Sequence, residues 1–146
     1  MAARITDGEY HALSQLRYLI RKFLQEGDTT ARDAGLEPQQ YLLLLTIRGL
    51  EAGREPSVQA LADRLALRHH STVELIDRLE AHGLVKRTRG REDRRQVLVS
   101  LQPRGEKLLG KVVNKRIVEL RSHGHALVAA ISKLLEAGPG KSKRKI

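Results

Sequence analysis

The sequence contains no cysteine and no tryptophan, and only 3% of its 146 residues are aromatic. Without cysteine there is no disulfide framework, no thiolate redox switch and no thiolate metal site. Apolar runs such as Tyr41 to Leu45 are far too short to span a bilayer. The first residues also lack the charged and apolar blocks of a signal peptide. These absences predict a cytoplasmic protein that does not bind membranes.

The chain instead has a large excess of positive charge. Its 27 lysine and arginine residues outnumber 17 acidic residues, which gives a formal net charge of +10. Such an excess favours a polyanionic partner, because neutralised phosphates release counterions and this release drives binding. Six of the ten residues from Lys86 to Arg95 are basic. This local cluster, rather than a basic helix with aromatic residues opposite, favours nucleic acid over an anionic membrane.

Hydrophobic periodicity predicts helices in the first half of the chain. A first amphipathic helix runs from about Asp7 to Gln25 and ends in the stretch 27–30, and a helix from Pro38 to Gly49 is apolar on nearly all sides and should be buried. Ser57 is suited to cap a short helix up to residue 65, and another runs from His69 to the glycine at position 83. Two short helices joined by a tight turn form a helix-turn-helix pattern.

The period then changes from helical to alternating, which predicts two strands over residues 84–88 and 96–101. The loop between them carries most of the cluster of arginines, so the positive charge lies on a hairpin next to the helix-turn-helix. Pro103 starts another helix that reaches about Ser122, and a last amphipathic helix covers 125–137.

LADRL, followed by STVELIDRLEAHGLVKRTRGREDRRQVLVSLQPRGEKLL, resembles the DNA-binding core of the MarR family of bacterial transcriptional regulators. The likeness covers residues 36–109 and is most specific in the hairpin. It implies a mainly α fold with a small β-hairpin, a winged helix-turn-helix with N- and C-terminal dimerisation helices. The implied segments are dimerisation helices 1–36 and 103–138, the DNA-binding lobe 37–102, and a disordered basic tail 139–146.

The resemblance implies a homodimer that binds double-stranded DNA at a pseudo-palindromic operator, as a repressor. Apolar faces on helices outside a self-contained central block favour the dimer independently, and burial within one chain is the alternative. No nucleophile elbow, phosphate-binding glycine loop or Cys/His triad is present, so we expect no enzymatic activity and no cofactor. The alternative function is an architectural protein that coats DNA without sequence preference.

In a winged helix-turn-helix the second helix enters the major groove with its first turns leading. Residues opposite its apolar stripe are therefore candidates for base and phosphate contacts. They are Arg68, His69, His70, Ser71, Glu74 and Arg78. A solvated helix face, with Glu74 and Arg78 paired four residues apart, is the alternative. Arg68 stands where family members often have Ser, Thr or Pro, so the helix lacks its usual cap.

The hairpin, or wing, is predicted to place an arginine in a narrow minor groove, where the negative potential is strongest. Arg94 is the first candidate and Arg95 the second, while Lys86, Arg89 and Arg91 are candidates for phosphate contacts. Asp93 is an anion on a surface that binds anions. We therefore expect it to hold a wing arginine or backbone amides, and so to shape the loop.

MarR-like proteins commonly respond to small aromatic acids, so the resemblance also raises the possibility of a small-molecule effector. The candidate lining residues combine cations with aromatic rings: Tyr10, Arg17, Tyr18, Tyr41 and Arg48. Core packing of Tyr41 and solvent exposure of the arginines are the alternatives. His11, His123 and His125 could meet at a zinc ion in a dimer, but a histidine pair around Gly124 fits a helical corner better, so we expect no metal.

Overall fold

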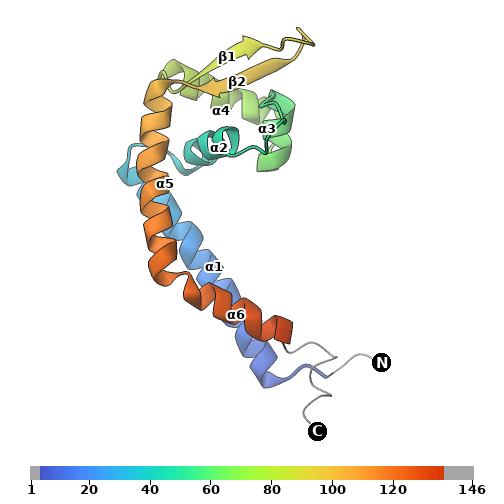
Figure 1. Cartoon of the computed structure of the whole chain (residues 1–146), viewed down its shortest axis with the longest axis vertical. Coiled ribbons are helices and arrows are strands. Elements are labelled where there is room, and N and C mark those ends of the chain that lie inside the picture. The colour runs from blue at the N-terminus through green and yellow to red at the C-terminus, as the bar shows by residue number, and fades with distance from the viewer. Residues whose placement is uncertain (1–3, 137–146) are drawn as a thin grey trace. The chain divides into compact units, whose positions relative to one another are not determined.

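The computed structural model describes residues 4–136, so the predicted tail 139–146 lies outside the described residues. In this part of the chain there are six helices and one hairpin (Figure 1), as the sequence predicts. The helices are α1 (Asp7–Asp33), α2 (Pro38–Arg48), α3 (Val58–Leu65), α4 (His69–Ala81), α5 (Pro103–His123) and α6 (His125–Glu136), and the strands are β1 (Val85–Arg89) and β2 (Val97–Leu101).

The chain divides into two compact units. The first combines Met1–Gly27 with Lys115–Ile146, and the second is Asp28–Asn114. The second unit therefore contains the helix-turn-helix and the hairpin, and the first contains most of the two terminal helical regions. The assignment of these regions to dimerisation stays a prediction.

Helix α1 is longer than the sequence predicts. The prediction of an end near Gln25 is wrong, because the helix continues through Gly27 to Asp33. Thr30 and Ala31 are buried, and burial of this last part outweighs the poor intrinsic helix propensities of the stretch 27–30. The residue that marks the end of α1 is Gly35, whose φ of 90° lies in the left-handed region.

A buried cation ties α1 to α5 inside the first unit. Arg116 is only 5% exposed, and its Nη2 donates to the Phe23 carbonyl oxygen at 2.6 Å. The guanidinium also pairs with Glu119 and lies over the Phe23 ring, 4.2 Å from its centroid. A Cβ on Gly27 would lie 3.2 Å from Nε of Arg116. The glycine that looked like a helix end therefore makes room for this arginine.

The core of the second unit lies between α2, α3, α4 and the hairpin. Its fully buried side chains include Leu43, Leu44, Leu61, Ile76, Leu79 and Val99. The prediction that α2 is buried holds for Tyr41, Leu43 and Leu44 but not for its other side, where Leu42 and Leu45 are 43% and 37% exposed. Helix α2 packs against α3, α4 and β2, and this packing covers only one side of the helix.

Helices α3 and α4 end in the same way, with one residue in the left-handed conformation. Ser57 caps the start of α3, as predicted, by accepting from the Ala60 amide at 3.1 Å. The C-cap of α3 is Ala66, with φ 55°, and the residue after the C-cap of α4 is Gly83, with φ 72°. In both cases the next residue donates back to the helix, which is the Schellman arrangement. Ala66 is the unusual one, since this conformation favours glycine.

Replacing Ala66 with glycine should stabilise the protein by about 1 kcal/mol, because glycine avoids the strain that a Cβ causes in this conformation. The converse substitution, Gly83→Ala, is the matched control. No atom lies within 4 Å of a Cβ at Gly83, so only backbone strain is added, and stability should fall by a similar amount. Urea unfolding at one protein concentration measures both. A loss of stability in Ala66→Gly would contradict the prediction.

The hairpin is antiparallel, with Val85 opposite Leu101 and Arg89 opposite Val97. The loop end projects beyond the helices of the second unit (Figure 1). On the other edge of β2, the Val99 amide donates to the Pro56 carbonyl oxygen at 2.9 Å, and Ser57 forms a bridge with Leu98. This pairing is too short to be read from the sequence. It attaches β2 to the start of α3.

Candidate nucleic-acid interface

The first turn of α4 begins without a side-chain cap. Arg68 is the N-cap residue, in an extended conformation, and its side chain makes no capping hydrogen bond. His69 and His70 therefore occupy the first two helical positions, and both are exposed. The two histidines are therefore exposed at a helix start, where an anion could reach them.

The two sides of α4 differ as the sequence predicts. Thr72, Leu75, Ile76 and Leu79 are buried. His70, Glu74 and Arg78 are exposed at intervals of four residues and so share one face, with Ser71 half-buried beside it. Within residues 4–136, Glu74 and Arg78 do not form an ion pair with each other. The exposed face of α4 thus carries hydrogen-bond donors and acceptors, and it carries charges of both signs.

The tip of the wing is held in shape by its own residues. The amide of Gly90 donates to the Gln96 carbonyl oxygen at 2.8 Å, and a Cβ at Gly90 would lie 2.6 Å from the Asp93 carbonyl oxygen. Oδ1 of Asp93 accepts from the amide of Arg95 at 3.0 Å and pairs with its guanidinium. This is the bracing role that the sequence predicts for Asp93.

Some wing cations bind other groups of the wing, and these form a first group; others, which bind no protein group in residues 4–136, form a second. Arg89 lies in the first group, because its Nη1 donates to the Arg94 carbonyl oxygen at 3.0 Å and so supports the loop. Lys86, Arg91 and Arg94 form the second group: they are exposed, and their side chains make no hydrogen bond or ion pair within the described residues. Arg94 is therefore presented by a braced loop with its guanidinium available.

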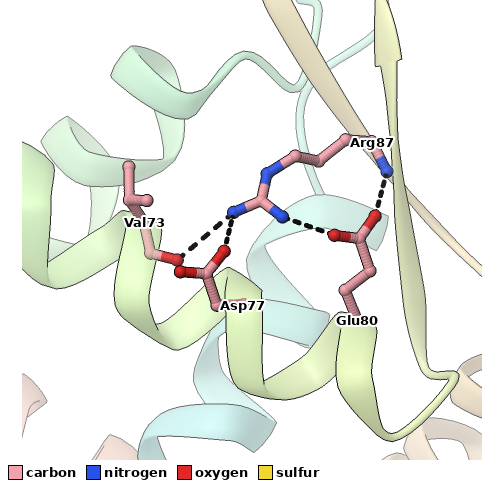
Figure 2. Close-up of polar contacts among 4 residues, drawn as sticks. All are labelled: Val73, Asp77, Glu80 and Arg87. Carbon is pink, nitrogen blue, oxygen red and sulfur yellow. Dashed lines mark hydrogen bonds and ion pairs between the residues drawn. The ribbon is translucent and has the colours of Figure 1, made fainter.

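Arg87 is a structural cation that the sequence analysis did not single out. Figure 2 shows its guanidinium across α4, with hydrogen bonds to Asp77, to Glu80 and to the Val73 carbonyl oxygen. Partial burial lowers the pKa of Arg87, but hydrogen bonds and charges of Asp77 and Glu80 outweigh it and raise that pKa above its ordinary value. The available signal was the spacing of Val73, Asp77 and Glu80, which puts them on one helix face.

A groove of about 430 Å³ lies in the second unit between the helix-turn-helix and the wing. Its lining includes Gln59 at the start of α3, His69 at the start of α4 and Arg95 on the wing. The structure therefore brings the helix start and the wing, predicted separately from the sequence, to two sides of one groove. Gln59 is a lining residue that sequence reasoning did not find.

The candidate effector residues do not share one environment. Tyr10, Arg17 and Tyr18 are exposed on α1. Tyr41 is buried in the core of the second unit, and Arg48 pairs with Glu106 at 3.0 Å. No group of three or more His, Cys, Asp or Glu residues that could hold a metal ion occurs in the described part of the chain.

Comparison with known proteins places these features in a family. A family model described as the MarR family matches residues 34–96. Over 106 residues the chain is 30% identical to YsmB of Bacillus subtilis (strain 168), an uncharacterized HTH-type transcriptional regulator; the match covers 73% of this chain and 70% of YsmB. The chain belongs to the MarR family. Members of the MarR family are transcriptional regulators rather than enzymes.

Solved structures agree with this assignment. A MarR family protein from Bacillus stearothermophilus is 25% identical and superposes with a TM-score of 0.69, covering 91% of this chain and 94% of that protein. A MepR variant of S. aureus, bound to an oligodeoxyribonucleotide, is 19% identical with a TM-score of 0.61, covering 92% and 99%. The second likeness shows the fold alone. Within residues 4–136, no helix is long and apolar enough to cross a membrane.

Proposed function

We propose that the protein is a cytoplasmic, homodimeric repressor that binds a pseudo-palindromic operator through α4 and the wing. The observation that carries the proposal is the braced wing, which leaves Arg94 exposed and shares one groove with the start of α4 through Arg95 and His69. In a winged helix-turn-helix these two parts contact adjacent grooves of the duplex. The groove between them then receives the phosphate backbone, with His69 and Arg95 on its walls.

The homodimer is supported by the apolar residues that one chain leaves exposed. Among residues 4–136, fourteen large apolar side chains are exposed, and twelve of them lie in the first unit. Along α1, Leu13, Ile20 and Leu24 recur on one face and are 52%, 43% and 57% exposed. Exposed apolar surface of this extent marks an interface, and a second copy with the same surface would cover it.

Repression follows from occupancy, since a dimer on its operator blocks polymerase from the same DNA. Release by a small aromatic acid is a further proposal, and its exposed candidates on α1 are Tyr10, Arg17 and Tyr18. Tyr10 and Tyr18 are the more accessible aromatic members, because they are 62% and 58% exposed whereas Tyr41 is 9% exposed. A thermal-shift screen with aromatic acids tests this part. Failure to find a stabilising acid leaves the DNA-binding proposal intact.

Replacing Arg94 with alanine should weaken operator binding by about 1 to 3 kcal/mol, because one minor-groove contact and its counterion release are lost. Lys111→Ala is the matched control, since it removes one exposed cation from α5, away from the wing. Fluorescence anisotropy with a labelled operator duplex measures both variants. If Arg94→Ala binds as tightly as Lys111→Ala, the minor-groove assignment is wrong.

A further inference from the structure

We propose that Arg87 is a positioning residue for DNA binding: anchored by Asp77 and Glu80, it fixes the wing against the recognition helix. The inference rests on the proposed function and extends it to a residue that lines the same groove but whose guanidinium binds groups of α4. It begins from the four hydrogen bonds that Arg87 makes to one face of α4. Its guanidinium binds Asp77, Glu80 and the Val73 carbonyl oxygen, and its amide donates to Glu80 at 3.1 Å.

These contacts join strand β1 to α4 at three positions along the helix. Positions 73, 77 and 80 lie on one face of α4, so the groups that bind the flat guanidinium come from about two helical turns (Figure 2). Glu80 binds both the side chain and the backbone of Arg87. A rotation of β1 relative to α4 would break several of these bonds together. The arrangement therefore fixes an orientation, where a single ion pair would fix only a distance.

Arg87 supplies the polar part of this attachment, beside the buried core that Val85 and Val99 of the hairpin share with α4. Within residues 4–136, every hydrogen bond and ion pair that joins α4 to the hairpin strands involves Arg87. Strand β2 is attached instead to Pro56 and Ser57, at the start of α3. A two-stranded hairpin has little stability by itself, so its direction depends on such attachments. Arg87 is the polar attachment of the hairpin to the recognition helix.

Burial separates Arg87 from the exposed cations at the tip of the wing. Its side chain is 26% exposed, whereas that of Arg95 is 93% exposed. The Arg87 charge is also matched by two carboxylates on α4, so it has little attraction left for DNA. Arg87 lies next to the proposed interface because it neutralises those carboxylates and holds the wing. Without it, unpaired Asp77 and Glu80 would repel phosphates.

The test is a substitution that removes negative charge and still weakens binding. Asp77→Asn should lower operator affinity about tenfold, because an anchor of the wing is lost. The matched control is Glu92→Gln, which neutralises an exposed wing carboxylate that makes no hydrogen bond or ion pair within the described residues. The control should bind as tightly as the parent or slightly tighter, since it only reduces repulsion. Tighter binding by Asp77→Asn would overturn the proposal.

Salt dependence separates positioning from a loss of folded protein. Each phosphate contact contributes about 0.9 to the slope of log affinity against log salt concentration. Asp77→Asn removes no cation, yet its slope should become shallower if misplaced wing cations lose their phosphates. The exchanged pair Asp77→Arg with Arg87→Asp should recover at least part of the affinity and slope. An unchanged slope in Asp77→Asn, with normal folding by circular dichroism, would contradict the proposal.

A measurement without DNA distinguishes this proposal from the proposed function. The chain has no cysteine, so Ala81→Cys on α4 and Glu92→Cys on the wing give two unique sites for spin labels. The distance distribution should be narrow in the parent and broader with Arg87→Gln. If the parent fails to bind operator DNA and Arg87→Gln still broadens the distribution, the proposed function fails and the positioning role stands. An unchanged distribution in Arg87→Gln would refute the role itself.

Discussion

Gly105→Ala should destabilise the protein by about 3 kcal/mol, at the upper end of the cost of overpacking. A Cβ at this position would lie 2.2 Å from the Leu84 carbonyl oxygen and 3.1 Å from its carbonyl carbon. Leu84 cannot easily move, because its side chain is buried and its amide donates to the Leu79 carbonyl oxygen at 3.0 Å. The same Leu84 carbonyl oxygen also accepts from the Gln102 amide at 2.8 Å. The first turn of α5 therefore packs directly on the backbone between α4 and β1.

Gly110→Ala is the control for this prediction, because it makes the same change in the same helix. Nothing lies within 4 Å of a Cβ at Gly110, which is exposed in the interior of α5. Alanine there should stabilise the protein by about 1 kcal/mol through its higher helix propensity. Urea unfolding at one protein concentration measures both variants. Two changes of the same sign would show that backbone contact with Leu84 does not determine the outcome.

Leu13→Glu combined with Leu24→Glu should dissociate the proposed dimer and lower operator affinity by on the order of 10² to 10⁴-fold, because each lobe then binds alone. The two leucines are eleven residues apart, which places them on one face of α1. Both are more than half exposed in a single chain, so charge there does not disturb the core of that chain. Sedimentation equilibrium and operator titration measure the two effects.

Ser14→Glu combined with Gln15→Glu provides the control for the dimer prediction. Both positions are exposed on α1, and this variant adds the same two negative charges without removing apolar surface. It should remain dimeric and lose little affinity. A dimeric Leu13→Glu/Leu24→Glu protein would show that this face of α1 is not the interface. Equal dissociation of both double variants would assign the effect to net charge.

Local rules predicted those parts of the fold that depend on neighbours in sequence. Ser57 as a cap, Gly83 as a helix end and the change of period at the hairpin could be read directly, because each follows from backbone geometry over a few residues. The same rules failed at Gly27. Its role depends on Arg116, a residue from a distant part of the chain that occupies the space beside it. Tertiary contacts of this kind leave no local pattern.

The candidate interface shows the same division. Clustered charge located the wing, and helical spacing located the exposed face of α4. Neither pattern could distinguish the roles of the wing arginines. The roles of Arg87, Arg89 and Arg94 depend on which partners lie within reach of each side chain. Arg87 and Arg89 bind groups of the protein, and only Arg94 of these three leaves its guanidinium available within residues 4–136. The predicted contacts of α4 and the wing with DNA stay predictions.

The central claim is that the protein recognises a DNA sequence through paired lobes, and an operator titration at increasing salt tests it most directly. The full chain is titrated against a palindrome from the region upstream of its own gene and against a scrambled duplex of equal length. The account predicts that both affinities fall as salt rises, while the palindrome remains favoured by about 10³-fold or more at physiological salt. Affinities that fall together with no preference for the palindrome would contradict it and indicate an architectural DNA-binding protein.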